Sequence, residues 1–169
     1  MTAKFAMVEK TPAVGDLVRH KGWGSLVRRV SSDLTMRTVH RTGYLRDNKG
    51  NLIPDKNNRL IPAKETYEGL HMQVSPVPGL LAPKYTPKRS SWVFPNWWNP
   101  VVEVAKLTKA QREVYKQLLS ARGRQAAKYT EANRMVVAGL ERQFAVACCG
   151  ACALPQWVPG LKYLSSKPL

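Results

Sequence analysis

Six prolines between residues 76 and 100 restrict the fold of this chain more than any other feature of its sequence. They are Pro76, Pro78, Pro83, Pro87, Pro95 and Pro100. A proline lacks the backbone N–H and its ring clashes with the preceding helical turn, so no helix can run through this stretch. The spacing instead favours an extended, polyproline-like backbone. We therefore predict an extended Pro-rich strap over residues 47–100, lying on the surface of a larger body.

The strap also carries large aromatic side chains. Its end, SSWVFPNWWNP at residues 90–100, contains three tryptophans and no charged residue. Tryptophan is enriched at the energetic centres of protein interfaces and at the headgroup level of membranes. The pattern favours anchoring on a partner protein or at a membrane interface, and leaves packing in the chain's own core and stacking on RNA bases open. The predicted anchors are Trp92, Phe94, Trp97 and Trp98.

A helical pattern follows the strap. Two segments are typical of a helix start: Asn99–Pro100, with an N-cap residue before a proline, and Thr108–Gln111, which fits a capping box. Apolar residues then recur at spacings of three and four towards the cysteines. The pattern predicts either one long helix over 109–149 or two helices with a break near Gly123 or Thr130.

The N-terminal arm, residues 1–46, is basic and mixed in composition. Its stretch VGDLVRHKGWGSLVRRV predicts two short strands, Asp16–His20 and Ser25–Val30, joined by a turn at Gly22-Trp23-Gly24. The Gly-Asp opening and the Lys-Gly turn resemble those of small β-barrel RNA-binding modules in ribosomal proteins. This resemblance covers only that stretch.

A short repeat lies in the first part of the strap. Leu52-Ile53-Pro54-Asp55-Lys56 recurs eight residues later as Leu60-Ile61-Pro62-Ala63-Lys64. Two copies are too few for a solenoid. Because Asp55 to Asn58 has turn chemistry and the prolines exclude a central strand, the repeat predicts an extended, hairpin-like arm.

The predicted fold class is mainly α with extended irregular segments, and not a compact catalytic domain. Four regions follow from the patterns: an N-terminal arm with two short strands, the strap with its Trp anchors, a long basic helical region and an irregular C-terminal tail, at residues 1–46, 47–100, 101–154 and 155–169. Arms and straps bury little apolar surface alone. This organisation therefore predicts a chain that becomes ordered on a larger assembly.

The net charge indicates the class of partner. The chain has 27 Lys and Arg against 11 Asp and Glu, a formal net charge of +16. Such an excess predicts a polyanionic partner, either RNA or an anionic membrane surface. The residues predicted to contact phosphate, of lipid or of RNA, precede the tryptophans or lie along the helical region: Lys88, Arg89, Arg112, Lys116, Arg122, Arg124 and Lys128.

Sequence motifs of the common enzyme classes are absent. The chain has no GxxxxGK[ST], GxGxxG, HExxH or GxSxG. Its three cysteines lie together in CCGAC, as Cys148, Cys149 and Cys152, and no second pair completes a zinc set. We predict no catalytic, cofactor-binding or metal-binding residue, and small apolar packing for the cysteines. A disulfide or a metal contact is the alternative.

The N-terminus is rich in Arg, Lys, Ser and Thr and poor in acids, which is typical of mitochondrial targeting regions. The best candidate for a membrane span, Phe144–Leu154, has eleven residues, whereas a spanning helix needs about 20. The N-terminus predicts a mitochondrial location; association with the inner membrane is what the resemblance described next implies, with a matrix location as the alternative.

The basic N-terminus, the segment 83–100, the helical stretch 109–149 and the lack of catalytic motifs together resemble the lineage-specific accessory subunits of mitochondrial complexes, notably those of the dimeric ATP synthase in euglenozoan protists. The resemblance implies a non-catalytic structural subunit that braces neighbouring subunits in the membrane region or peripheral stalk and contacts cardiolipin. No site residue carries over, because no motif of that family is matched. The alternatives are a lineage-specific mitochondrial ribosomal protein that binds rRNA, and a small thiol or metal protein built on CCGAC.

Overall fold

The structure is a computed structural model of the full chain, and it describes residues 3–22, 26–77, 80, 89–150 and 158–169. The chain forms two compact units. The first, which we call the sheet-and-helix unit, consists of residues 1–33 and 73–157. The second, the ribbon unit, consists of residues 34–72 and 158–169.

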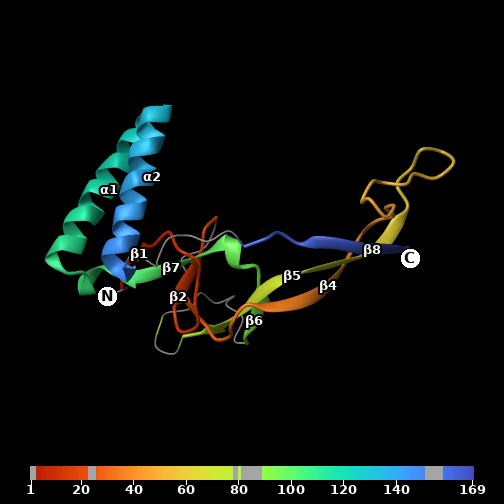
Figure 1. Ribbon diagram of the computed structural model, residues 1–169, viewed down its shortest axis with the longest axis horizontal. Coiled ribbons are helices and arrows are strands. Elements are labelled where there is room, and N and C mark those ends of the chain that lie inside the picture. The colour runs from red at the N-terminus through yellow and green to blue at the C-terminus, as the bar shows by residue number, and fades with distance from the viewer. Residues whose placement is uncertain (1–2, 23–25, 78–79, 81–88, 151–157) are drawn as a thin grey trace. The chain divides into compact units, whose positions relative to one another are not determined.

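The sheet-and-helix unit contains a small antiparallel sheet (Figure 1). Its strands lie in the order β1 (Phe5–Met7), β7 (Trp98–Glu103), β2 (Leu17–His20), β3 (Arg28–Val30) and the end of β5 (Pro62–Pro76). β6 (Ser91–Val93) also pairs with β5. The register places Val30 opposite Val74, and both are buried. Buried residues at every second position are typical of an antiparallel sheet with one covered face.

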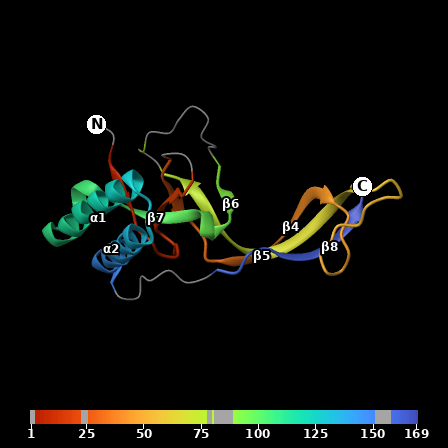
Figure 2. The same cartoon turned by 90° about the horizontal axis from the view of Figure 1, so that it is seen from above.

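Two helices complete this unit, α1 (Lys109–Ala127) and α2 (Glu131–Cys149). Thr108 forms a full capping box with Gln111, and Thr130 accepts the backbone N–H of Asn133 at the start of α2. Figures 1 and 2 show the helices side by side. Of the two predicted alternatives, the structure therefore has the helix pair, with its break at Thr130, and Gly123 lies inside α1.

The helices pack on each other and on the first strand through apolar side chains. Phe144 is fully buried, and its ring stacks on Tyr115 with 5.4 Å between the ring centroids. The core cluster consists of Ala6, Val8, Leu107, Leu118, Ala121, Val137, Phe144 and Ala145. Burial of this apolar surface is the main favourable term for the fold of the unit.

The ribbon unit is a three-stranded antiparallel ribbon (Figure 1). Its strands are β4 (Thr35–Tyr44), the Pro62–Met72 part of β5, and β8 (Lys162–Pro168), with β5 in the middle. The register runs from Thr35 opposite His71 to Tyr44 opposite Pro62, and β8 pairs with the other edge of β5. Residues 45–61, which we call the tip, connect β4 to β5.

The prediction of a mainly α fold was wrong. The described residues form eight strands, of which β5 and β6 lie within the predicted strap and β7 begins in it. The prolines did not exclude β5, because Pro62 and Pro76 are its first and last residues and every residue between them keeps its N–H. The predicted irregular tail likewise contains strand β8. Pro78, Pro83 and Pro87 lie outside the described residues.

The predicted helix start at Asn99–Pro100 was also wrong, because both residues belong to β7. Asn99 is buried, and its Nδ2 donates to Glu9 Oε1 at 2.9 Å. The carbonyl of Pro100 accepts the N–H of Val8 at 2.8 Å. The two predicted N-terminal strands are present as β2 and β3, each shorter than predicted, and the turn at Trp23 and Gly24 lies outside the described residues.

Candidate polyanion-binding surface

The excess positive charge is unevenly neutralised. All the acidic residues of the chain lie in the part that the structure describes. Six of them, Asp16, Glu65, Glu68, Glu103, Glu131 and Glu141, form ion pairs there with Lys10, Arg41, Arg46, Lys106, Arg122, Arg134 and Lys162. Several other described cations have no ion pair within the described ranges. Two groups of them stand out: Lys49, Lys56, Arg59, Lys64 and Lys167 in the ribbon unit, and Lys109, Arg112, Lys116, Arg124 and Lys128 in or directly after α1.

A buried carboxylate organises the ribbon unit. Glu65, on β5, is only 3% exposed. Its two oxygens accept hydrogen bonds from Arg46 Nε at 2.8 Å, the Tyr67 hydroxyl at 2.8 Å and Arg41 Nε at 3.4 Å. The bond from Arg46, followed by those from Tyr67, the backbone N–H of Tyr44 and Arg41, lowers the pKa of Glu65 to about 2. The carboxylate is therefore charged at any physiological pH and fixes two arginines of the ribbon.

The two faces of the ribbon both carry cations. Directly opposite residues of an antiparallel pair have their side chains on the same face. Arg41 lies opposite Glu65, so it shares the face of that carboxylate, and its guanidinium lies 4.2 Å from the centroid of the Tyr67 ring. Lys64, one residue before Glu65, is on the other face, directly opposite Lys167 of β8. Two like charges in this position repel each other, so a bound anion between them would relieve the repulsion.

The tip presents further cations on an ordered backbone. The Oδ1 of Asp47 accepts the N–H groups of Lys49 and Asn51 at 2.8 and 2.9 Å. These bonds, that from Asn51 first, lower the pKa of Asp47. A second turn of the same kind is closed by Asp55, whose Oδ1 accepts the N–H groups of Asn57 and Arg59 at 2.8 Å each. Both turns therefore have a backbone fixed by hydrogen bonds, and the lysine and arginine side chains on them are exposed.

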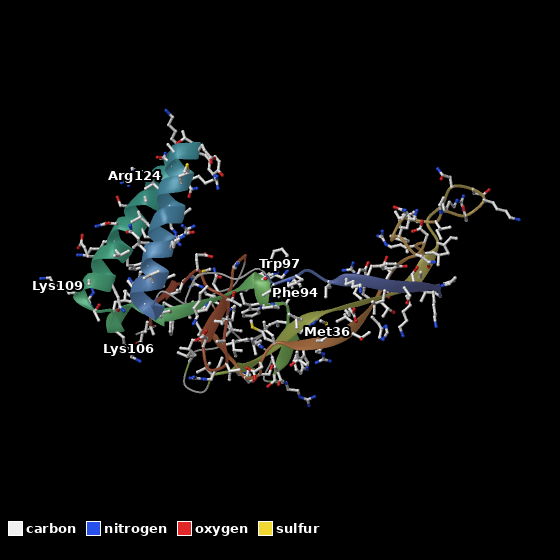
Figure 3. All side chains as sticks on the ribbon, in the orientation of Figure 1. Met36, Phe94, Trp97, Lys106, Lys109 and Arg124 are labelled. Carbon is white, nitrogen blue, oxygen red and sulfur yellow. The ribbon has the colours of Figure 1, made fainter. Side chains whose placement is uncertain are left out.

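The second group of cations follows the exposed side of α1. Lys109, Arg112, Lys116 and Arg124 lie within one broad face of the helix, and Lys109 and Arg124 are near its opposite ends (Figure 3). An open hollow of about 340 Å³ beside this face is lined by Lys116, Gln117, Ser120, Arg124 and Leu140. Four of the helical cations predicted to contact phosphate, Arg112, Lys116, Arg124 and Lys128, are thus exposed and without an ion pair among the described residues.

Arg122 differs from the other predicted phosphate contacts. Its Nη2 forms an ion pair with Glu141 Oε1 of α2 at 3.2 Å, so it joins the two helices. Arg89 is exposed, before β6, and Lys88 lies outside the described residues.

The predicted aromatic anchors divide into two kinds. Trp92 and Trp97 are 39% and 59% exposed, whereas Phe94 and Trp98 are half-buried. The ring of His20 is parallel to that of Trp97, with centroids 6.3 Å apart, and meets the ring of Trp98 edge-on at 5.4 Å. The structure thus brings Trp97 and Trp98 together around His20, a residue that the sequence did not indicate.

The two cysteines that the structure describes, Cys148 and Cys149, are free thiols. Cys148 is partly buried, and this burial, together with the neighbouring Cys149, raises the pKa of its thiol to about 11. The nucleophilic thiolate is therefore scarce at neutral pH. No three side chains that could hold a metal ion lie together among the described residues, and Cys152 is not one of those residues.

Sequence reasoning missed the cations of the ribbon unit. Lys49, Lys56 and Arg59 lie beside the repeat and its turn residues, so the signal was present in the polar composition of the tip. Lys64, Glu65 and Lys167 gave no local signal, because they meet only through the pairing of strands distant in sequence.

None of the described helices is both long and apolar enough to cross a membrane. Comparison of the chain with models of protein families, with characterised proteins and with solved structures found no match.

Proposed function

We propose that this protein is a non-catalytic RNA-binding protein that serves as a structural component of a ribonucleoprotein particle such as a ribosome. The observation that carries the proposal is the set of cations without ion pairs on the ribbon unit and its tip. Their backbone is fixed by strand pairing, by the Asp47 and Asp55 turns and by the Glu65 cluster. Cations on a fixed backbone lose less conformational entropy on contact with phosphate than cations on a flexible segment would.

The distribution of these cations favours RNA over a membrane. Lys64 lies on one face of the ribbon, and Lys49, Lys56 and Arg59 lie at its tip. The other face carries Arg41, which pairs with Glu65 but keeps 55% of its side chain exposed. A flat lipid surface contacts one side of a ribbon at a time. Folded RNA presents phosphates from several directions, and can therefore neutralise both faces and the tip together.

The weak core of the ribbon unit points the same way. Its buried side chains include Glu65 and His71 beside only a few apolar residues. A ribbon of so few strands is only marginally stable in water unless something packs on it. A partner that supplies negative charge would stabilise the ribbon. It would also account for the lysines of the ribbon that have no ion pair among the described residues.

The test compares unpaired with paired cations. Binding of a labelled, folded RNA hairpin is measured by fluorescence anisotropy over a salt series, for the parent chain and two triple variants. One variant, K49Q/K56Q/R59Q, removes tip cations. The control, K10Q/K106Q/R134Q, removes the same charge from cations held in ion pairs with Asp16, Glu103 and Glu131.

We expect the parent affinity to fall steeply with salt, because each phosphate contact adds about 0.9 to the slope of log affinity against log salt. The tip variant should reduce this slope by about 2 to 3, and the control variant by less than about 1. Equal losses in the two variants, or no binding of RNA by the parent chain, would overturn the proposal.

The resemblance to accessory subunits of a mitochondrial ATP synthase stays a prediction, as does the mitochondrial location. Co-sedimentation with vesicles that contain cardiolipin tests it alongside the RNA measurement. Retention on such vesicles at about 0.15 M salt, without RNA binding under the same conditions, would replace the RNA proposal by the membrane one.

A further inference from the structure

Trp97 is an exposed aromatic ring on a fixed backbone. It is the last residue of η1 (Pro95–Trp97), and its N–H donates to the carbonyl of Phe94 at 3.2 Å. Its own carbonyl accepts the N–H of Lys21 at 2.8 Å. The following residue, Trp98, begins β7 and pairs with His20 of β2. The backbone on both sides of the indole is therefore held by hydrogen bonds.

The ring itself is also oriented. The imidazole of His20 is within 3° of parallel to the indole of Trp97 and lies edge-on to Trp98, which is half-buried. The Nδ1 of His20 accepts the N–H of Gly22 at 3.0 Å, which fixes the rotation of the imidazole. We call Trp97, Trp98 and His20 the indole platform. Packing of this kind sets the plane of Trp97 before any ligand binds.

Most of the indole nevertheless stays in water. Trp97 is 59% exposed, and Figure 3 shows it together with Phe94 on the short segment before β7. Lys21, whose N–H bonds to Trp97, is exposed, and its side chain has no ion pair within the described ranges. A flat aromatic face with a cationic residue bonded to it through the backbone suits a nucleotide, which has a planar base and a negative phosphate.

We propose that Trp97 stacks on an unpaired base of the RNA that this protein binds. The inference rests on the proposed function and adds to it the class of RNA element: a single-stranded nucleotide in a loop, bulge or end, where a base can leave its own stack. Lys21 contacts a phosphate of the same or the adjacent nucleotide. Because every base has a flat face, the platform accepts any base.

The partner-protein anchor that the aromatic pattern also predicts would need a different arrangement. Anchors in protein interfaces are surrounded by contacts that exclude water, and they fill pockets in the partner. The ring of Trp97 is parallel to the imidazole of His20, and its backbone bonds to that of Lys21. This arrangement suits a charged, planar ligand better than an apolar pocket.

The test separates stacking from phosphate contact. The full chain is titrated with two labelled single-stranded RNA ten-mers: a decauridylate and a ten-mer of equal charge whose sugars carry no bases. The variants are W97A, W97L and W97F. W97L keeps an apolar side chain without a π face, and W97F keeps an aromatic ring. Tyr129→Ala removes another highly exposed aromatic side chain, 74% exposed, and serves as the control.

We expect W97A and W97L to weaken binding of decauridylate by roughly 5- to 150-fold, and W97F to retain most of it. Binding of the baseless ten-mer should be unchanged in all variants, and Tyr129→Ala should bind both RNAs as the parent does. A single 2-aminopurine in the RNA should lose fluorescence on binding to the parent and regain it with W97L.

Two results would overturn the stacking proposal while leaving RNA binding intact. One is equal affinity of W97L and parent for decauridylate, and the other is an equal loss of both ten-mers in W97L. Failure of the parent to bind either ten-mer or the folded hairpin would instead overturn the proposed function. If W97A fails to fold, the comparison of W97L with W97F decides the question.

Discussion

The two units of the chain are stabilised by different physical means. The sheet-and-helix unit buries apolar side chains, with Phe144, Leu118 and Val8 fully inside. The ribbon unit buries a carboxylate, and its strands meet around Glu65, Arg46 and Tyr67. Apolar burial is almost independent of pH and salt, whereas an ionic cluster depends on both. The comparison therefore separates a unit that can be stable alone from a unit whose stability responds to its surroundings.

The difference also bears on function. A unit with a sufficient apolar core has no need of a partner for stability. A ribbon with cations on both faces and little apolar core gains stability when a polyanion binds. We therefore expect the ribbon unit to be the part of the molecule whose protection against hydrogen exchange rises most when RNA is added.

The largest effect should come from the apolar core. Phe144→Ala removes a fully buried ring that stacks on Tyr115, and should lower the free energy of unfolding of the sheet-and-helix unit by about 3 to 5 kcal/mol. Pulsed hydrogen exchange with peptide mass spectrometry reports each unit separately. If peptides of the ribbon unit lost protection as much as those of α1 and α2, the two units would not differ as we describe.

The next effect should come from the ionic cluster, and it should depend on pH. Glu65→Gln should lower the free energy of unfolding of the ribbon unit by about 2 kcal/mol at pH 7, because it removes the buried charge that two arginines contact. The pKa of Glu65 is lowered from 4.5 to about 2 in the folded chain. The contribution of its charge is therefore complete above pH 4.5 and is lost as the pH falls towards 2.

The measurement for Glu65 is the difference in stability between the parent and the Gln variant at several pH values between 2 and 7. This difference should shrink as the pH falls, while the effect of Phe144→Ala stays nearly constant. A difference for Glu65→Gln that does not change with pH would show that the side chain contributes through packing and not through its charge.

The smallest effect should come from a pair of glycines in the ribbon. A methyl group at Gly43 would lie 2.6 Å from Oε2 of Glu65, whose carboxylate is held in place by four hydrogen bonds, two to each oxygen. Gly43→Ala should therefore cost about 1 to 2 kcal/mol. At Gly69 the nearest atom is the Cδ2 of Leu161, at 2.7 Å, the end of a side chain that can rotate away. Gly69→Ala should change stability by less than about 0.5 kcal/mol, and thermal unfolding by circular dichroism compares the two.

Local patterns predicted the parts of the fold that local interactions determine. The capping box at Thr108 and the apolar spacing of three and four predicted the helical stretch. The turn residues Gly22-Trp23-Gly24 between two short segments predicted β2 and β3. The sequence did not predict β5. Its buried face carries Ala63, Glu65, Tyr67 and His71, so apolar and polar residues do not alternate along the strand. Period-two patterning marks a strand only when the covered face is apolar.

The part of the candidate surface that depends on local structure was likewise predictable from the sequence, and the part that depends on strand pairing was not. The cations of α1 share a face because of helix geometry, and most of them are exposed; their contact with phosphate stays a prediction. The Lys64–Lys167 pair could not be predicted, because β8 joins β5 from about a hundred residues further along the chain, and no local rule gives that register. The indole platform depends in the same way on β2 meeting β7, which brings His20 to Trp98.

The tip of the ribbon is built from two copies of one turn, eight residues apart. In each copy an aspartate accepts the N–H groups two and four residues ahead, and the third residue ahead has a positive φ, 85° at Gly50 and 60° at Asn58. Leu45 bonds to both copies, through its carbonyl to Ile53 and through its N–H to Ile61. A deletion of one copy would join Asn51 to Leu60 and leave an equivalent turn facing Leu45. The tip can therefore become shorter or longer in steps of one eight-residue turn, without a shift in the register of β4 on β5.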